Sequence, residues 1–224
     1  MTEQKIKIVK DGPYLVTGNV PLSEKIITER DGHYALEDGR ILPLKASYAL
    51  CRCGHTKTPP FCDGSHIQEH FKGQETCSRQ TYAHRARCEV TGPALDLYDD
   101  GRCAFARFCH RNGSNAWELT ERSDDPKLKN EAIIAASECP SGRLTAVDKD
   151  GHRFENKYIP SIEILLDPVN NAAGPVSVKG GIPIESTDGT VYEIRNRVTL
   201  CRCGRSKNKP FCDAQHILSD KDKK

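Results

Sequence analysis

Alternating apolar and polar positions predict short strands near both ends of the chain. The segment IKIVKD begins with an apolar, polar, apolar run at Ile6, Lys7 and Ile8, and IEILLD repeats this run from Ile162. An alternation of period two places successive side chains on opposite faces of a strand. Gly-Pro, Asp-Gly and Gly-Gly pairs separate the runs and indicate turns. Each end of the chain is therefore predicted to form a small set of strands.

The two ends are copies of one pattern. GPYLVTGNVPL at 12–22 parallels GPVSVKGGIPI at 174–184, and YALCRCG, from Tyr48, parallels VTLCRCG, from Val198. The first copy contains a longer stretch, ERDGHYALEDGR, and the second contains VNNAAG. We expect both insertions in surface loops. The repeat predicts two related structural units.

A different pattern separates the copies. The apolar positions of one segment have helical spacing: Leu128, Ala132, Ile133 and Ala136. The Cys139-Pro140 pair predicts the end of this helix. Leu95–Tyr98 and Leu144–Val147 have strand-like patterns. We therefore expect an α+β fold, with a repeat at 1–72, an inserted α+β module at 73–160 and a second repeat at 161–224.

Composition narrows the class of protein. Only 37% of the 224 residues are hydrophobic, so small cores would benefit from bound metal. The net charge of +2 does not favour nucleic acid as a partner. We find no apolar run of membrane-spanning length and no signal peptide, and expect a cytoplasmic protein. In that setting the 11 cysteines favour metal binding over disulfides.

Two similar strings carry the candidate metal ligands. CRCGHTKTPPFCDGSH starts at Cys51, and CRCGRSKNKPFCDAQH starts at Cys201. Both have the spacing C-x-C-x8-C-x3-H, which supplies three thiolates and one imidazole. The candidate ligands are Cys51, Cys53, Cys62 and His66 in the first string and Cys201, Cys203, Cys212 and His216 in the second. Such a set suits a dinuclear iron cluster as well as it suits a single zinc ion.

The strings resemble the CDGSH iron–sulfur family, the mitoNEET-like proteins. The first matches the family pattern throughout, whereas the second departs at Ala214 and Gln215. The resemblance implies one 2Fe–2S cluster per string, with Cys-x-Cys on one iron and Cys-x3-His on the other. The resemblance also implies that family members with a single motif are obligate homodimers. Two copies in one chain therefore predict an intramolecular pseudo-twofold dimer, in which strands of 6–22 and 162–184 join, and a monomeric protein.

Residues around the ligands lead to further expectations. A histidine ligand should raise the reduction potential and make the cluster sensitive to acid. Asp63 and Asp213 are expected to cap short helices that carry the histidines. Thr56, Ser206 and the backbone after Asp63 are candidate donors to sulfur. We interpret the basic residues of the strings as solvated surface, with a docking patch for an acidic partner as the alternative: Arg52, Arg202 and 207–209.

The inserted module contains candidates for a third cluster, Cys103, Cys109 and Cys139. Its sequence resembles divergent mono-cluster ferredoxins, including the ending CPSGRL. Three thiolates suit a 3Fe–4S cluster, and a 4Fe–4S cluster would need another ligand, such as Cys77 or Cys88. The alternative is three buried structural cysteines. Nearby histidines are expected at the surface: His55, His84 and His110.

These patterns favour an iron–sulfur protein that transfers electrons to a redox protein partner. Cluster transfer or storage and redox sensing are alternatives, and a zinc-stabilised interaction module is an alternative of another class. We expect no enzymatic activity, because the chain shows no nucleotide-binding glycine loop, nucleophile motif or carboxylate pair.

Overall fold

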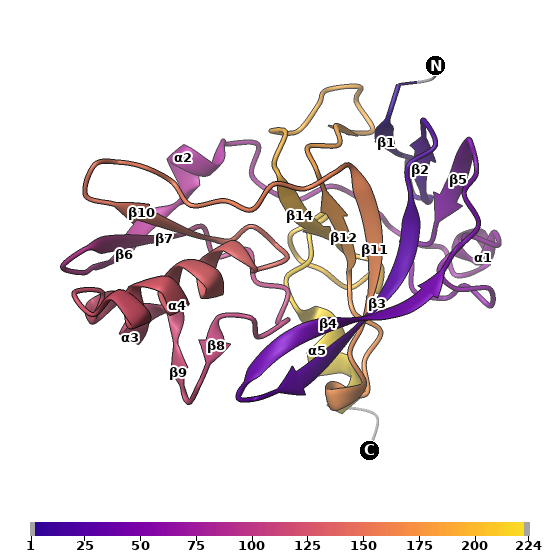
Figure 1. Ribbon diagram of the computed structural model, residues 1–224. Coiled ribbons are helices and arrows are strands. Elements are labelled where there is room, and N and C mark those ends of the chain that lie inside the picture. The colour runs from indigo at the N-terminus through magenta and orange to yellow at the C-terminus, as the bar shows by residue number, and fades with distance from the viewer. Residues whose placement is uncertain (1–2, 222–224) are drawn as a thin grey trace.

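The structure of the protein is a computed structural model that describes residues 3–221. It is a mixed structure with more strand than helix, as the α+β expectation requires. A four-stranded sheet has the order β13-β1-β2-β5, and a seven-stranded sheet has the order β14-β12-β11-β3-β4-β8-β9. A three-stranded sheet, β10-β7-β6, belongs to the inserted module, which lies to one side of the other two (Figure 1).

The strands of the four-stranded sheet come from both ends of the chain. Their bounds are Lys5–Ile8 (β1), Tyr14–Thr17 (β2), Ser47–Leu50 (β5) and Ile184–Glu185 (β13). Ile6 and Ile8 are buried and Lys7 is exposed between them, which confirms the predicted alternation. Full burial of such a side chain stabilises the fold by about 1.5–3 kcal/mol.

The seven-stranded sheet also combines distant segments. Its strands are Leu22–Arg30 (β3), His33–Ile41 (β4), His110–Arg111 (β8), Ser114–Asn115 (β9), Ser161–Leu166 (β11), Val176–Lys179 (β12) and Arg197–Leu200 (β14). The segment before β12 includes the 3-10 helix η1 at Pro168–Asn170.

Each repeat supplies a strand that pairs in parallel with the first strand of the other repeat. Ile6 of β1 pairs in parallel with Ile184 of β13, and Leu22 of β3 pairs in parallel with Ile162 of β11. In the aligned copies Ile6 corresponds to Ile162 and Leu22 to Ile184. The two pairings are thus reciprocal. One apolar core contains buried side chains of both repeats.

The insertion at 29–40 is a β-hairpin and not the expected surface loop. β3 and β4 pair along most of their lengths, and Asp31 and Gly32 occupy the turn with φ of 47° and 77°. Two positive φ angles characterise the tight turns whose twist matches a hairpin. His33 of β4 then pairs with Arg111 of β8. The insertion therefore connects the first repeat with the inserted module.

The inserted module packs two helices against its sheet. The elements are Arg87–Thr91 (β6), Leu95–Asp99 (β7), Leu144–Asp148 (β10), Ala116–Glu121 (α3) and Pro126–Ser137 (α4). Asn115 caps α3 and Asp125 caps α4 through their side chains. α4 ends two residues before Cys139, as the Cys-Pro pair predicted. Buried alanines of both helices pack against leucines of β7 and β10.

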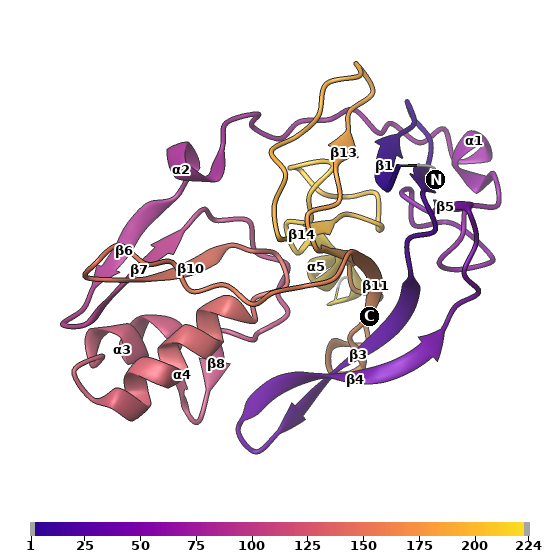
Figure 2. The same ribbon diagram turned by 45° about the horizontal axis from the view of Figure 1, so that its top comes forward.

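Three short helices complete the fold: Ser65–Gln68 (α1), Tyr82–Arg85 (α2) and Gln215–Lys221 (α5). In both views α1 lies on the side opposite the inserted module, and β11 and β14 lie between them (Figures 1 and 2). Among the described residues, no helix has the length and apolar character needed to cross a membrane.

Candidate metal centres

The first CDGSH string forms a loop directly after β5, and its candidate ligands lie in two close pairs. The Sγ atoms of Cys51 and Cys53 are 3.6 Å apart, and Sγ of Cys62 lies 3.4 Å from Nδ1 of His66. Two ligands of one tetrahedral metal would lie about 3.7 Å apart for two sulfurs and about 3.5 Å apart for sulfur and nitrogen. Each pair therefore has the spacing of two ligands on one metal.

The second string, after β14, repeats this geometry. The Sγ atoms of Cys201 and Cys203 are 3.7 Å apart. Sγ of Cys212 lies 3.6 Å from Nδ1 of His216. Within the part of the chain that the structure describes, no three His, Cys, Asp or Glu side chains converge as the site of one ion. Each loop thus presents its four candidate ligands as two separate close pairs.

Backbone hydrogen bonds explain how each loop brings its pairs close. The amide of Cys51 donates to Pro60 O at 2.9 Å, and the amide of Cys62 donates to Ala49 O at 2.9 Å. The second loop has the same bonds from Cys201 to Pro210 O and from Cys212 to Thr199 O. These bonds extend the strand before each loop and set its first and third cysteines side by side.

An aspartate fixes the end of the first loop. The carboxylate of Asp63 accepts hydrogen bonds from the amides of Lys57 at 2.7 Å and Ser65 at 3.0 Å. It lies one residue before Gly64, the N-cap of α1, so it binds the start of the helix from a position adjacent to the expected cap. The helix carries His66 toward Cys62.

The second loop is fixed in the same way. Asp213 accepts from the amides of Lys207 at 2.7 Å and Gln215 at 3.3 Å. Ala214 takes the place of Gly64 and keeps a left-handed φ of 68°, compared with 91° for Gly64. The departure from the family pattern therefore leaves the loop conformation unchanged in kind, at the cost of strain that glycine avoids.

The donors to sulfur are backbone amides and not the expected hydroxyls. Thr56 donates to Phe61 O at 2.6 Å, and Ser206 donates to Phe211 O at 2.7 Å, so the expectation for these two side chains is wrong. The amide of Gly54 lies 3.3 Å from Sγ of Cys51. The amide of Ala214 lies 3.4 Å from Sγ of Cys212. Such donors favour the thiolate form that binds metal.

Burial acts on several of these thiols before metal is bound. It raises the pKa of Cys53 to about 11 and is the main cause of a raised pKa at Cys212. A hydrogen bond with Cys201 lowers the pKa of Cys203 to about 7. Metal binding must therefore displace protons from the buried thiols.

The arginines of the strings are structural, which corrects their interpretation as solvated surface. Arg52 is only 2% exposed, and its guanidinium donates to Val9 O, Gly12 O and Gly73 O at 2.8–3.0 Å. Arg202 donates through Nε to Gly174 O at 2.6 Å. Each arginine fixes its loop to the segment before the second strand of its own repeat. Charge alone did not reveal this role.

The two loops lie against each other. A Cβ atom at Gly54 would lie 2.7 Å from Cys203 O, and a Cβ atom at Gly204 would lie 2.5 Å from Cys53 O. Both glycines have positive φ, so glycine meets two requirements at each position. A cavity of about 280 Å³ between the loops is bordered by residues of both, including Cys51, Cys203 and His216. The sequence signal for these glycines was their identical place after each Cys-x-Cys pair.

The two loops differ in exposure. Cys212 and His216 are 3% and 4% exposed, whereas Cys62 and His66 are partly exposed. The second centre is therefore buried at its Cys-His side and partly exposed at Cys203, whereas the first is buried at Cys51 and Cys53 and partly exposed at its Cys-His side.

The three cysteines proposed for a third cluster border one small cavity in the inserted module. Cys103 and Cys109 begin and end the loop around it, and Cys139 faces it from the end of α4. Burial, followed by the charges of Cys139 and Cys103, raises the pKa of Cys109 to about 11. The cysteines thus lie within electrostatic reach of one another without converging on one ion, which fits one thiolate per iron in a cuboidal cluster.

Two arginines shape this third site. Arg143, which sequence reasoning did not single out, borders the cavity and binds Asp99, with Nε 2.6 Å from Oδ1. Arg107, within the cysteine loop, binds both carboxylate oxygens of Asp167 in the second repeat at 2.7 and 2.9 Å. The cysteine loop is therefore attached to the second repeat.

The remaining candidates lie elsewhere. Cys77 packs against the shared core of the repeats, and Cys88 is exposed on β6; neither borders the cavity of the third site. The histidines that were expected at the surface are exposed: His55, His84 and His110.

Comparison with known families agrees with these sites. Residues 11–67 and 173–217 match the family described as iron-binding zinc finger CDGSH type, and residues 90–149 match the divergent 4Fe-4S mono-cluster family. No curated protein and no solved structure matches the chain. Both matched CDGSH segments contain the paired ligands, and the segment between them contains the three cysteines of the third site. Two segments of the chain therefore belong to the CDGSH family, and they flank a segment that matches the divergent 4Fe–4S mono-cluster family.

Proposed function

We propose that this protein carries single electrons between protein partners through three iron–sulfur centres, without enzymatic activity of its own. In each CDGSH loop a 2Fe–2S cluster would be held by the Cys-x-Cys pair on one iron and by the Cys-His pair on the other. The ligands are then Cys51, Cys53, Cys62 and His66 in the first loop and Cys201, Cys203, Cys212 and His216 in the second.

The observation that carries the proposal is the separation of each ligand set into two pairs. Within each pair the spacing, 3.4–3.7 Å, is that of two ligands on one metal. Among the described residues no single-ion site joins them. A zinc-stabilised module would need all four ligands on one ion.

When bound, a 2Fe–2S cluster accepts and releases one electron. The chain contributes the electrostatic setting. Amides such as those of Gly54 and Ala214 donate toward cysteine sulfur and lower the cost of added negative charge. A neutral imidazole in place of a fourth thiolate acts in the same direction. Burial of the Cys212–His216 pair keeps water from that side of the second centre.

For the third site we propose a 3Fe–4S cluster on Cys103, Cys109 and Cys139, with one thiolate for each iron. The family match to a 4Fe–4S domain keeps a four-iron cluster as the alternative. Neither Cys77 nor Cys88 borders the cavity, so a fourth ligand would have to be another group. Arg143 provides a cation beside this site.

We also propose that the repeats form an intramolecular pseudo-twofold dimer and that the protein is a monomer. The reciprocal pairings of β1 with β13 and of β3 with β11 support this arrangement, as do the reciprocal contacts of Gly54 and Gly204. Light scattering at micromolar concentration should give a mass near 24.9 kDa. A stable mass of twice this value would contradict the proposal.

Cluster delivery is a second candidate function, restricted to the first loop. The observation that favours it is the partial exposure of Cys62 and His66. Mixing loaded protein with an apo-ferredoxin tests it: delivery requires that iron and sulfide move together to the acceptor. An electron carrier would instead reduce a loaded acceptor and keep its own iron.

The decisive experiment is anaerobic purification followed by counts of iron and acid-labile sulfide, with EPR spectra of oxidised and reduced protein. The proposal expects acid-labile sulfide in both CDGSH centres, whose oxidised 2Fe–2S clusters give no EPR signal. It also expects an EPR signal from the oxidised 3Fe–4S cluster of the third site. Cys109→Ser should remove only that last signal. Stoichiometric zinc without sulfide would refute the proposal.

A further inference from the structure

A single stacking contact joins the neighbours of two proposed cluster ligands. The guanidinium carbon of Arg102 lies 4.0 Å from the centre of the Phe211 ring. Arg102 directly precedes Cys103 of the third site, and Phe211 directly precedes Cys212 of the second CDGSH loop.

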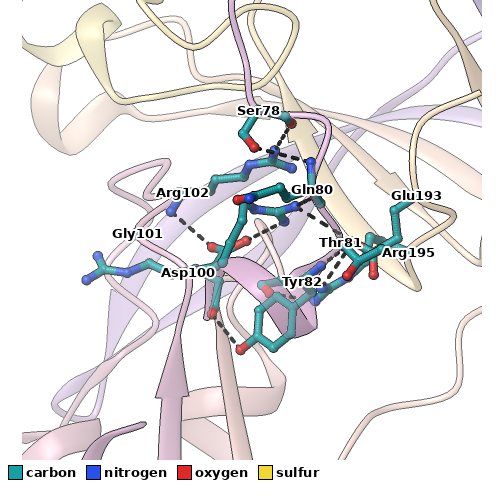
Figure 3. A network of polar contacts seen from close by, with 12 residues as sticks. Ser78, Gln80, Thr81, Tyr82, Asp100, Gly101, Arg102, Glu193 and Arg195 are labelled. Carbon is teal, nitrogen blue, oxygen red and sulfur yellow. Dashed lines mark hydrogen bonds and ion pairs between the residues drawn. The ribbon is translucent and has the colours of Figure 1, made fainter. Parts of the chain in front are cut away.

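A polar network holds Arg102 in this position (Figure 3). Nη2 of Arg102 donates to Ser78 O at 3.1 Å, and its amide donates to Asp100 Oδ1 at 3.0 Å. The other carboxylate oxygen of Asp100 accepts from Arg85 at 2.8 Å. Arg102 is thus fixed at both its backbone and its side chain, and the stack does not depend on a freely moving side chain.

The same network fixes the second repeat against the inserted module. The amide of Tyr82 donates to Glu193 at 2.7 Å, and the guanidinium of Arg195 stacks on the Tyr82 ring at 3.9 Å. Figure 3 places these residues beside Asp100 and Arg102. Together with the Arg107–Asp167 ion pair, these contacts attach the third site to the second repeat at more than one point.

The first repeat provides an internal comparison. Phe61 holds the position that Phe211 holds in the second repeat, and the cation over its ring is Lys45 of the same repeat, at 5.6 Å. The inserted module therefore approaches the two repeats differently at equivalent positions. The views of the whole fold agree, because α1 of the first loop lies on the side opposite the inserted module (Figures 1 and 2).

The second loop is in direct contact with the first. Gly54 and Gly204 allow the backbones of the two loops to approach within distances that leave no room for a Cβ atom. Short steps therefore lead from the third site to the second loop, and from the second loop to the first.

We propose that the second CDGSH loop is an internal electron relay, connected to the third site by the Arg102–Phe211 stack, with the first loop as the exposed end of the route. This inference rests on the proposed function. With clusters bound, an electron supplied to the third site by an external one-electron donor would pass to the cluster of the second loop, so that the third site is oxidised by one electron as that cluster is reduced by one. A further transfer to the cluster of the first loop would return the second cluster to its oxidised state.

The physical basis is that the rate of electron tunnelling falls steeply as the through-space gap between atoms widens. Between Cys103 and Cys212 the route follows the covalent chain to Arg102, one stacked contact and the covalent chain from Phe211. Burial of Cys212 and His216 suits an internal relay, because neither ligand faces an external partner. The partly exposed Cys62–His66 pair suits the exchange of electrons with a partner.

Pulse radiolysis of loaded, anaerobic protein tests the relay. The radical pulse reduces accessible centres, and the later redistribution of electrons appears as a first-order absorbance change that is independent of protein concentration. Arg102→Gln keeps a polar side chain but loses the stacked guanidinium, and Phe211→Leu removes the ring. We expect both to slow this phase roughly tenfold, equivalent to about 1.4 kcal/mol of barrier. Phe61→Leu, the matched control, should leave it unchanged.

EPR of fully reduced protein separates a transfer path from simple docking. Magnetic broadening between the third site and the second loop reports their distance and should persist in Arg102→Gln. Unchanged rates in both variants, equal slowing in Phe61→Leu, or slowing accompanied by loss of broadening would each overturn the relay. Absence of iron and sulfide would instead defeat the proposed function, so the two failures are distinguishable.

Discussion

Replacement of Gly54 with alanine tests the contact between the two CDGSH loops. Gly54 has a φ of 86°, and the new methyl group would lie 2.7 Å from the backbone oxygen of Cys203. The obstacle is backbone and not the end of a flexible side chain, so one loop must move. Gly64→Ala is the matched control, because Gly64 has a φ of 91° but no atom within 4 Å of the added methyl group.

The expected magnitudes follow from three terms. A left-handed alanine costs about 1–2 kcal/mol in either variant. Alanine also reduces the flexibility of the unfolded chain, which stabilises the folded state by about 0.4–1 kcal/mol. Gly54→Ala also carries an overpacking cost of about 1–3 kcal/mol. The free energy of unfolding should therefore fall by about 2–4 kcal/mol for Gly54→Ala and by about 1 kcal/mol for Gly64→Ala.

Urea unfolding of loaded protein, followed by circular dichroism under anaerobic conditions, measures both values. Gly204→Ala should match Gly54→Ala, because its methyl group would lie 2.5 Å from Cys53 O. Equal destabilisation by Gly54→Ala and Gly64→Ala would refute the reasoning, because the added cost arises only from the loop contact.

Three further predictions concern single sites. Ala214→Gly should raise the free energy of unfolding by about 1 kcal/mol in the same assay, because it relieves a left-handed alanine; no gain would contradict that conformation. Asp167→Asn should lower it by about 3–5 kcal/mol, because Arg107 loses its buried partner. Burial acts to raise the pKa of Asp167, but hydrogen bonds from Arg107 and Asn170 lower it overall, so this stabilisation is present above the unfolded pKa, about 3.9, and is lost as pH falls through the folded value. A difference between wild type and variant that persists at low pH would exclude the ion pair as its cause. His66→Cys and His216→Cys should keep their clusters but lower their potentials in protein-film voltammetry, because a thiolate adds negative charge; unchanged potentials would show that these histidines are not ligands.

The parts of this structure that the sequence predicted depend on short-range patterns. The Cys-x-Cys and Cys-x3-His spacings confine their ligands to close pairs, whatever the rest of the chain does. The alternation of apolar and polar residues predicted β1. The helical spacing of apolar residues before the Cys139-Pro140 pair predicted α4. The hairpin of β3 and β4 had a readable signal in Asp31-Gly32, but the comparison of the two copies favoured a loop because one copy lacks the insertion.

The parts that the sequence did not predict depend on contacts between distant segments. Arg52 carries a charge, and its burial follows from carbonyl groups of Val9, Gly12 and Gly73 that surround it only in the folded chain. The stack of Arg102 on Phe211 joins residues of two modules and leaves no local pattern. The same holds for the approach of Gly54 to Cys203, since a glycine after Cys-x-Cys is compatible with any tight loop.

The exchange of strands between the repeats has a consequence for biosynthesis. β1 leaves the ribosome well before its parallel partner β13. The hydroxyl of Tyr14 likewise donates at 2.7 Å to Cys201 O, a group 187 residues further along the chain. The nascent first repeat therefore has an open sheet edge at β1 until the strands of the second repeat have been made. Iron and sulfide should enter the first loop only after the second repeat has been synthesised.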